Sequence, residues 1–153
     1  MKQKSNLRIG VDVDGVLYDN YICTPSQVMP FSYDSLHELK NDGHKLYIIS
    51  SRVERNTTIT KDWLDENYGK NLFEKILLGC DRKGMVCRDR NIDIMIDDFF
   101  HYLQQCEKYN VYGLLMDNFL NRSFEETKYI KRVNDWQDAA RYIKNGRHRK
   151  NNP

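Results

Sequence analysis

The amino-acid sequence predicts an α/β fold: a doubly wound, Rossmann-like parallel sheet of five to six strands with helices on both faces. Short apolar runs alternate with amphipathic segments along the chain, a pattern typical of parallel strands joined by helical crossovers. Such crossovers are right-handed, which places helices on both faces of the sheet. No Pro/Gly/Ser-rich linker divides the 153 residues, a length suited to one folded domain.

The predicted strands are short apolar runs, several of which end at a polar residue. The first runs from Leu7 into Asp12, and the second is apolar and β-branched at Ile48 and Ile49 before it reaches Ser50. Strands are predicted over residues 7–13, 45–50, 74–78, 93–97, 111–116 and 129–133.

The predicted helices lie between these strands and carry apolar residues at helical spacing. Residues 26–41 are predicted to be partly helical, because Leu36 and Leu39 share a face and Asp42-Gly43 is a stop signal. Further helices are predicted over residues 60–68, 83–90 and 99–109, and over a last segment that Asn134 or Asp135 can cap.

The composition is that of an ordinary globular protein and argues against several classes. The formal net charge of +2 does not by itself predict nucleic-acid binding. Residues 1–6 are polar and lack the apolar core of a signal peptide, and no apolar run is long enough to span a bilayer. The four cysteines show neither CxxC pairing nor metal-ligand spacing, so free thiols in a reducing cytoplasm are the simplest expectation.

The one charge asymmetry of the chain is the basic run in residues 147–150. We expect one domain over residues 1–146, followed by a solvated, disordered basic tail over residues 147–153. The alternative for this tail, a weak electrostatic contact with an anionic partner, stays open.

Polar side chains stand at the ends of four predicted strands, namely Asp12, Ser50, Asp97 and Asp117. In open α/β sheets, ligands bind outside the carboxyl ends of the strands. The sequence therefore predicts a polar ligand site at this edge of the sheet.

Two pairs of acidic residues make this edge a candidate metal site. Asp12 and Asp14 are two residues apart in an extended segment, so their carboxylates can face the same side. The alternative is an acidic turn at Gly15. Asp97 and Asp98 follow another strand, where either can also cap the next helix. Several carboxylates at one edge repel each other, and a hard cation with oxygen ligands relieves that repulsion.

A hydroxyl at the end of the second strand adds a feature of a phosphate site, whereas Lys83 by itself indicates nothing more than a surface lysine. Ser50-Ser51-Arg52 ends the second strand, where a hydroxyl and free N–H groups at a helix start suit a phosphate oxygen. The alternatives are that Ser50 caps the next helix and that Lys83 is a solvated surface lysine.

The ordered set of residues resembles the haloacid dehalogenase-like hydrolases, whose four motifs all find a match between Asp12 and Asp98. The first motif, Asp12-Val13-Asp14-Gly15-Val16-Leu17-Tyr18-Asp19, is the most specific of them. Within that superfamily the chain looks most like the 5′-nucleotidase, deoxyribonucleotidase (type C) group. This closer resemblance is carried by residues 47–52, 96–98 and 115–122.

The resemblance implies a phosphatase domain over residues 1–146 and a role for each matched residue. Asp12 would attack phosphorus, and Asp14 would act first as the acid and then as the base. Mg²⁺ would be bound by Asp12, Asp14 (through its backbone carbonyl) and Asp97, with Asp98 in support. The phosphoryl oxygens would be bound by Ser50, Ser51, Arg52 and Lys83. The roles of Asp117 and Asn121 stay open.

The interval between Asp14 and Ser50 departs from the resemblance. Its 35 residues are too few for the helical cap domain that related nucleotidases carry there, so we predict no large cap domain. The expected substrate is a small phosphorylated molecule, in first place a nucleotide. An open site leaves two alternatives: a second subunit of a homo-oligomer supplies a lid, or the substrate is itself large, such as a nucleic-acid end or a phosphoprotein.

Two other classes of protein compete with the phosphatase interpretation. A phospho-acceptor module like a response-regulator receiver combines acids, a hydroxyl and a lysine on the same kind of sheet. The usual order in receivers places the acidic pair first, whereas here Asp12 and Asp14 come first and the Asp97-Asp98 pair comes last. A non-catalytic binding protein on the same fold is the third hypothesis, because fold alone does not define function.

Overall fold

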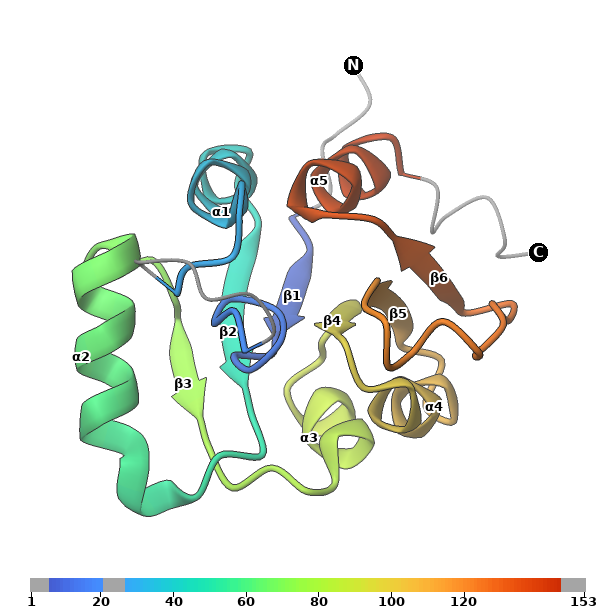
Figure 1. Ribbon diagram of the computed structural model, residues 1–153, viewed down its shortest axis with the longest axis horizontal. Helices are drawn as coiled ribbons and strands as arrows, with labels where there is room; N and C mark the ends of the chain where they lie inside the picture. Colours follow the sequence, from blue (N-terminus) through green and yellow to red (C-terminus); the bar gives the residue numbers. More distant parts are fainter. Residues whose placement is uncertain (1–5, 21–26, 147–153) are drawn as a thin grey trace.

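The computed structural model describes residues 6–20 and 27–146. It contains a six-stranded, fully parallel sheet, as predicted (Figure 1). The strand order is β3-β2-β1-β4-β5-β6, the order of a doubly wound Rossmann-like sheet. The strands are β1 (Arg8–Val11), β2 (Lys45–Ile49), β3 (Lys75–Leu77), β4 (Ile94–Asp97), β5 (Tyr112–Met116) and β6 (Ile130–Val133).

Within the described residues, five α-helices cover the two faces of this sheet. They are α1 (Ser32–Asn41), α2 (Thr57–Tyr68), α3 (Lys83–Asp89), α4 (Phe100–Glu107) and α5 (Trp136–Lys144), and a 3₁₀ turn, η1 (Glu54–Asn56), precedes α2. Buried residues of α1, α2 and α5 pack with one face of the strands, and those of α3 and α4 pack with the other (Figure 1). The predicted two-sided arrangement is therefore confirmed.

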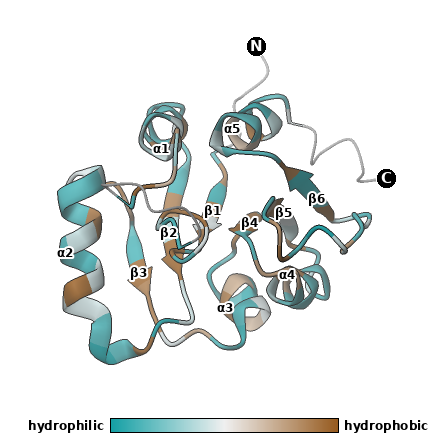
Figure 2. Cartoon of the chain, in the orientation of Figure 1, coloured by the Kyte–Doolittle hydropathy of each residue, from teal (hydrophilic) through white to brown (hydrophobic). Residues whose placement is uncertain are grey.

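The side-chain alternation of the strands produces two separate cores. In β2, Leu46 and Ile48 face the α1, α2 and α5 core, while Tyr47 and Ile49 face the α3 and α4 core. Hydrophobic segments lie in central strands such as β4, whereas the ribbon of α2 is mostly hydrophilic (Figure 2). Because the central strands are buried on both faces, only their ends remain for polar chemistry.

Two helices begin three or more residues away from their predicted start. The first begins at Ser32 rather than near residue 26, because Pro30 disfavours helical geometry at Met29 and Phe31 has a left-handed φ of 65°. The helix predicted over residues 60–68 begins three residues earlier, at Thr57, after η1. Neither difference moves a candidate site residue.

The turn after β1 is anchored to the far end of the chain. The Trp136 indole Nε1–H donates to the backbone oxygen of Val16 over 2.7 Å, and the indole is fully buried. This contact fixes the segment that follows Asp12 and Asp14 against the start of α5.

Several further predictions can be compared with the described part of the chain. Between Asp14 and Ser50, its residues form only the turn after β1, α1 and β2, so no large cap domain lies there. Cys80, Cys87 and Cys106 are buried free thiols. No helix within residues 6–20 and 27–146 is long and apolar enough to cross a membrane. Cys23 and the basic tail, 147–153, lie outside the described residues.

Candidate active site

The carboxyl edge of the sheet brings the predicted strand-end residues together. Asp12 directly follows β1, and its backbone N–H donates to the oxygen of Ile96 over 3.0 Å, which continues the β1–β4 pairing by one residue. Ser50 directly follows β2, and Asp97 is the last residue of β4. Lys83 begins α3 and reaches the same edge.

Three buried charges form the centre of this edge. The Lys83 ammonium lies 2.7 Å from Asp97 Oδ2 and 3.1 Å from Asp12 Oδ1. Lys83 and Asp97 are fully buried and Asp12 is 6% exposed. Removing such charges from water is costly, and an apolar group of similar volume would often be more stable. Their retention in the core therefore points to chemistry, and the alternative of a solvated surface lysine is excluded for Lys83.

The environment of this cluster raises the pKa values of both Asp12 and Lys83. Burial raises the pKa of Asp12 well above its usual value, the charge of Asp97 raises it further, and Lys83 opposes both. Burial alone would lower the pKa of Lys83, but the charges of Asp97 and Asp12 outweigh it, and the net pKa is raised. Lys83 therefore stays cationic, and a second cation near Asp12 would favour its carboxylate form.

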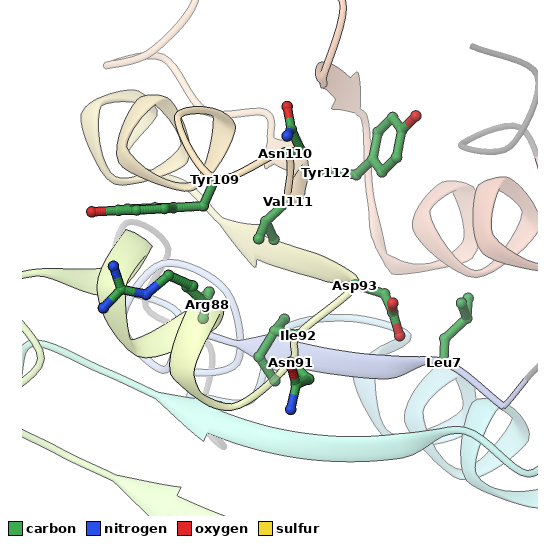
Figure 3. Close-up of a pocket in the computed structure, with 10 residues that line it drawn as sticks. Leu7, Arg88, Asn91, Ile92, Asp93, Tyr109, Asn110, Val111 and Tyr112 are labelled. Carbon is green, nitrogen blue, oxygen red and sulfur yellow. The ribbon is translucent and has the colours of Figure 1, made fainter. Parts of the chain in front are cut away.

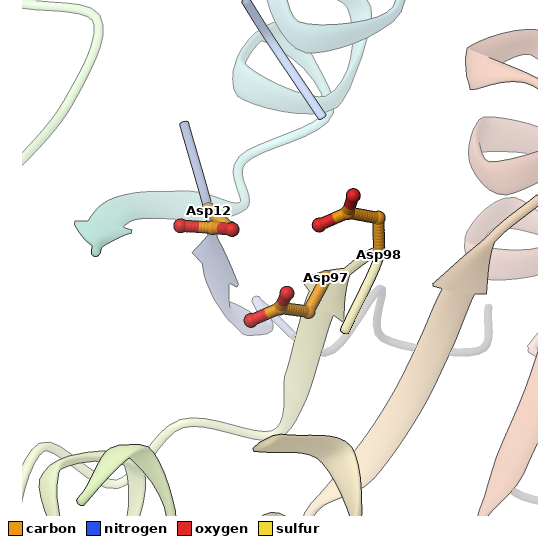
Figure 4. A group of neighbouring side chains, drawn as sticks. All are labelled: Asp12, Asp97 and Asp98. Atoms are coloured by element: carbon orange, nitrogen blue, oxygen red, sulfur yellow. The ribbon is translucent and has the colours of Figure 1, made fainter. Parts of the chain in front are cut away.

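A group of three carboxylates adjoins the lysine. One oxygen each of Asp12, Asp97 and Asp98 lie within 4.8 Å of one another (Figure 4). Gly15 makes room for this group: its φ is 74°, and a Cβ atom there would lie 2.1 Å from Asp98 Oδ2. An all-oxygen, anionic donor set is what Mg²⁺ prefers, so these residues fit a hard divalent cation.

Asp98, predicted only to support the metal site, contributes its carboxylate to this group. Its Oδ2 accepts a hydrogen bond from Asn118 Nδ2 over 3.1 Å, which orients it. Asp14 was predicted as a metal ligand through its backbone carbonyl, and its carboxylate lies outside the group.

The Asp14 carboxylate is bound by Arg52 instead. Arg52 Nε lies 2.8 Å from Asp14 Oδ2, and Arg52 Nη2 lies 2.7 Å from Asp14 Oδ1. Arg52 was predicted to bind phosphate together with Ser50 and Ser51. Ser50 is fully buried at the end of β2, with its Oγ accepting from the Arg52 backbone N–H over 3.1 Å, whereas Ser51 is exposed.

The loop after β5 supplies contacts that sequence reasoning missed. Asn121 Nδ2 donates to the backbone oxygens of Asp98, over 2.9 Å, and Met116, over 2.8 Å. Asp117 pairs with Arg132, whose Nη1 lies 2.8 Å from its Oδ1. Both residues stood out in the sequence, but their partners Asp98 and Arg132 lie in other segments of the chain and carry no local signal. Their role here is structural: they fix the loop that orients Asp98.

We expect Asn121→Ala to destabilise the fold and weaken binding of a divalent cation. The side chain is 3% exposed, and the backbone oxygens of Met116, in a buried contact, and Asp98, in a partly buried one, lose their amide donor. The expected cost is about 2 kcal/mol, or roughly 4–8 °C in Tm. Thermal unfolding with and without Mg²⁺ checks this, with the exposed Asn134→Ala as the control. Equal Tm values for the two variants would contradict it.

A separate cavity of about 600 Å³ lies at the opposite edge of the sheet (Figure 3). It is lined by residues that precede β1, β4 and β5, among them Leu7, Asp93 and Val111, and by Arg88 and Tyr109. None of the acidic group lines it, so the size of a cavity does not locate the chemistry in this molecule.

Fold and site together define the class of the protein: it has the architecture of the haloacid dehalogenase-like hydrolases. A hydrolase of that family from Streptococcus pneumoniae superposes with a TM-score of 0.66 at 12% identity, over 92% of this chain and 100% of the other. The 3-deoxy-D-manno-octulosonate 8-phosphate phosphatase of Moraxella catarrhalis superposes with a TM-score of 0.57 at 20% identity, over 97% and 88%. That structure was solved with a magnesium ion, a phosphate ion and a KDO molecule.

The chain belongs to the family described as 5′ nucleotidase, deoxy (Pyrimidine), cytosolic type C protein, whose model matches residues 24–149. The match begins after Asp12 and Asp14, so the placement of those two residues in the site is supported by the geometry described above and not by the family model. A relative from Oceanobacillus iheyensis, named "Putative nucleotidase OB0422", is 26% identical over 117 residues, which are 75% of this chain and 61% of the relative. The chain spans about three fifths of the length of the curated relatives it matches.

Proposed function

We propose that this protein is a phosphomonoesterase that transfers the phosphoryl group to Asp12 and then to water. The observation that carries the proposal is the buried contact of Asp12 with Lys83, 3.1 Å apart, beside Asp97 at the carboxyl edge. A buried carboxylate with a fixed cationic neighbour is a positioned nucleophile, and the fold and family support the same chemistry.

In the first step, an Asp12 oxygen forms a bond to phosphorus while the bond from phosphorus to the leaving oxygen breaks. Asp14 gives its proton to that leaving oxygen. Ser50 and Lys83 bind the non-bridging oxygens, and the backbone N–H groups near Ser51 add to them. Lys83 also keeps Asp12 oriented, because its ammonium contacts Asp12 and Asp97 at once.

In the second step, water attacks the phosphorus of the aspartyl-phosphate. Asp14, now a carboxylate, takes the proton of that water, and the bond between Asp12 and phosphorus breaks. Inorganic phosphate leaves, and Asp12 returns to its carboxylate form.

Asp12, Asp97, Asp98 and the backbone carbonyl of Asp14 would bind Mg²⁺, which supplies positive charge that screens the phosphate from the carboxylates. The closeness of the three carboxylates supports the proposal of a bound cation, because one Lys83 ammonium contacts both Asp12 and Asp97. Asn118 and Gly15 serve this binding indirectly, through Asp98.

For the substrate we propose a nucleoside monophosphate of the 5′(3′)-deoxyribonucleotide type. The matched family and the names of the relatives support this choice. With no large cap domain between Asp14 and Ser50, the site is open, so a lid from a second copy or a larger substrate stays a candidate.

Phosphate release tests the proposed activity. The panel contains an aryl phosphate, nucleoside and deoxynucleoside monophosphates, sugar phosphates, an oligonucleotide with a terminal phosphate and a phosphopeptide, each with Mg²⁺ and with EDTA. We expect Mg²⁺-dependent turnover of the aryl phosphate and the highest kcat/KM for a nucleotide. Preference for the oligonucleotide or phosphopeptide would favour a macromolecular substrate. No turnover of any compound by folded, Mg²⁺-binding protein would refute the activity.

A further inference from the structure

We infer that Arg52 is a positioning residue that fixes the carboxylate of Asp14 for proton transfer, rather than a ligand of the phosphate. This inference rests on the proposed function, since it assigns Arg52 a part in the same reaction. It differs from the sequence-based expectation, in which Arg52 bound phosphoryl oxygens beside Ser50.

Arg52 binds Asp14 through two hydrogen bonds, one to each carboxylate oxygen. Arg52 Nε and Nη2 donate to the two oxygens of Asp14 over 2.8 and 2.7 Å. A planar guanidinium that binds both oxygens fixes the plane of the carboxylate as well as its position. Arg52 and Asp14 are only partly exposed, with 21% and 41% of their side chains accessible, so the contact is sheltered from competing water on one side.

Arg52 is itself held by three different segments. Its Nη1 donates to Thr60 Oγ1 over 3.2 Å, and Thr60 is fully buried in α2. Its guanidinium carbon lies 5.5 Å from the ring centre of Tyr18, which packs edge-on against Trp63. Its backbone N–H donates to Ser50 Oγ. Arg52 therefore links the turn after β1 to the end of β2 and to α2.

These contacts leave Arg52 poorly placed to bind phosphate. Three of its five N–H groups already donate hydrogen bonds, and the Nε–Nη2 edge, which can bind two oxygens at once, is occupied by Asp14. Binding phosphate there would release Asp14. Lys83 already provides a cation that contacts Asp12 directly. Arg52 contributes instead by orienting the Asp14 carboxylate. A misplaced acid or base can lower the rate by about 10²-fold.

The inference is tested with Arg52→Ala and Arg52→Lys, assayed on an aryl phosphate for kcat, KM and the Ki of inorganic phosphate. We expect Arg52→Ala to lower kcat by about 10- to 100-fold, with KM and Ki changed by less than about 3-fold. Arg52→Lys keeps the charge but loses the two-point contact, so we expect it to recover little of the rate. Added guanidinium at millimolar concentration should restore part of kcat in Arg52→Ala but not in Arg52→Lys. The control is the exposed, neighbouring Arg55→Ala.

A second variant leaves Arg52 in place. Thr60→Val removes the hydroxyl that holds Nη1, and we expect kcat to fall about 3-fold, while the exposed Thr58→Val leaves it unchanged. If Arg52→Ala does not fold, the comparison of Thr60→Val with Thr58→Val tests whether the position of Arg52 affects kcat.

The outcomes separate the inference from the proposed function. A wild-type protein that turns over no phosphomonoester refutes the proposed function, and the role of Arg52 falls with it. Wild-type turnover with an unchanged kcat in Arg52→Ala overturns the inference alone. A Ki for phosphate raised 10-fold or more at unchanged kcat would show instead that Arg52 binds phosphate.

Discussion

Asp12→Asn is expected to abolish phosphate release and, in the absence of metal, to raise the Tm by a few degrees. The amide cannot attack phosphorus, so kcat should fall by at least about 10³-fold. The stability gain has a separate cause. Burial and the charge of Asp97 raise the pKa of Asp12, which means that ionised Asp12 destabilises the fold. Asparagine has the same size and no charge.

The pH dependence of this gain follows from the direction of the shift. The folded chain binds the Asp12 proton more tightly than the unfolded chain does. Stability of the metal-free wild type therefore falls as the pH rises from about 4, where an unfolded Asp ionises, toward the raised pKa of the folded state. The Tm of Asp12→Asn minus that of the wild type should grow over this range in EDTA. A constant or negative difference would contradict the conclusion that the buried charge of Asp12 destabilises the fold.

Lys83→Met is expected to be the most destabilising of the substitutions considered for the site. Methionine fills a similar volume, but the carboxylates of Asp12 and Asp97 then stay buried without their cation. Leaving a buried charge uncompensated costs about 3–5 kcal/mol, which corresponds to roughly 10 °C or more in Tm. Thermal unfolding in EDTA measures this, with the exposed Lys70→Met as the control.

A double variant identifies the cause of that loss. If repulsion and burial of the carboxylates are responsible, Lys83→Met combined with Asp97→Asn should regain a large part of the lost stability. Mg²⁺ should also stabilise Lys83→Met more than it stabilises the wild type, since it replaces the missing charge. Additive losses in the double variant would mean that Lys83 acts through other contacts, such as the cation–π contact of its ammonium with the ring of Tyr102, 4.3 Å away.

The sequence predicts the positions of Asp12, Ser50 and Asp97 because they depend on a simple rule. Each ends an apolar run, and the ends of parallel strands meet at one edge of the sheet. Lys83 could be placed there only through a family resemblance, since nothing local distinguishes a buried lysine from an exposed one. Its burial becomes visible only when α3 is docked on the sheet.

The partners of Arg52 and Asp98 could not be predicted in the same way. Arg52 contacts Asp14, 38 residues away, because the neighbouring strands β1 and β2 end at the same edge of the sheet. Asp98 is oriented by Asn118, which depends on the register between β4 and β5. The predicted start of the first helix differs from the observed one for a local reason, because the left-handed φ of Phe31 prevents an earlier start.

The central claim is that Asp12 carries the phosphoryl group, and peptide mass spectrometry after rapid acid quenching tests it most directly. An aryl phosphate is used with the wild type, Asp14→Asn and Asp12→Asn. Since an aryl leaving group needs little help from an acid, Asp14→Asn should still form the adduct but lose the base that hydrolyses it. We predict a phosphoryl group on the peptide that contains Asp12, most abundant in Asp14→Asn, short-lived in the wild type and absent from Asp12→Asn. Phosphorylation of another residue, or turnover by Asp12→Asn, would contradict the account.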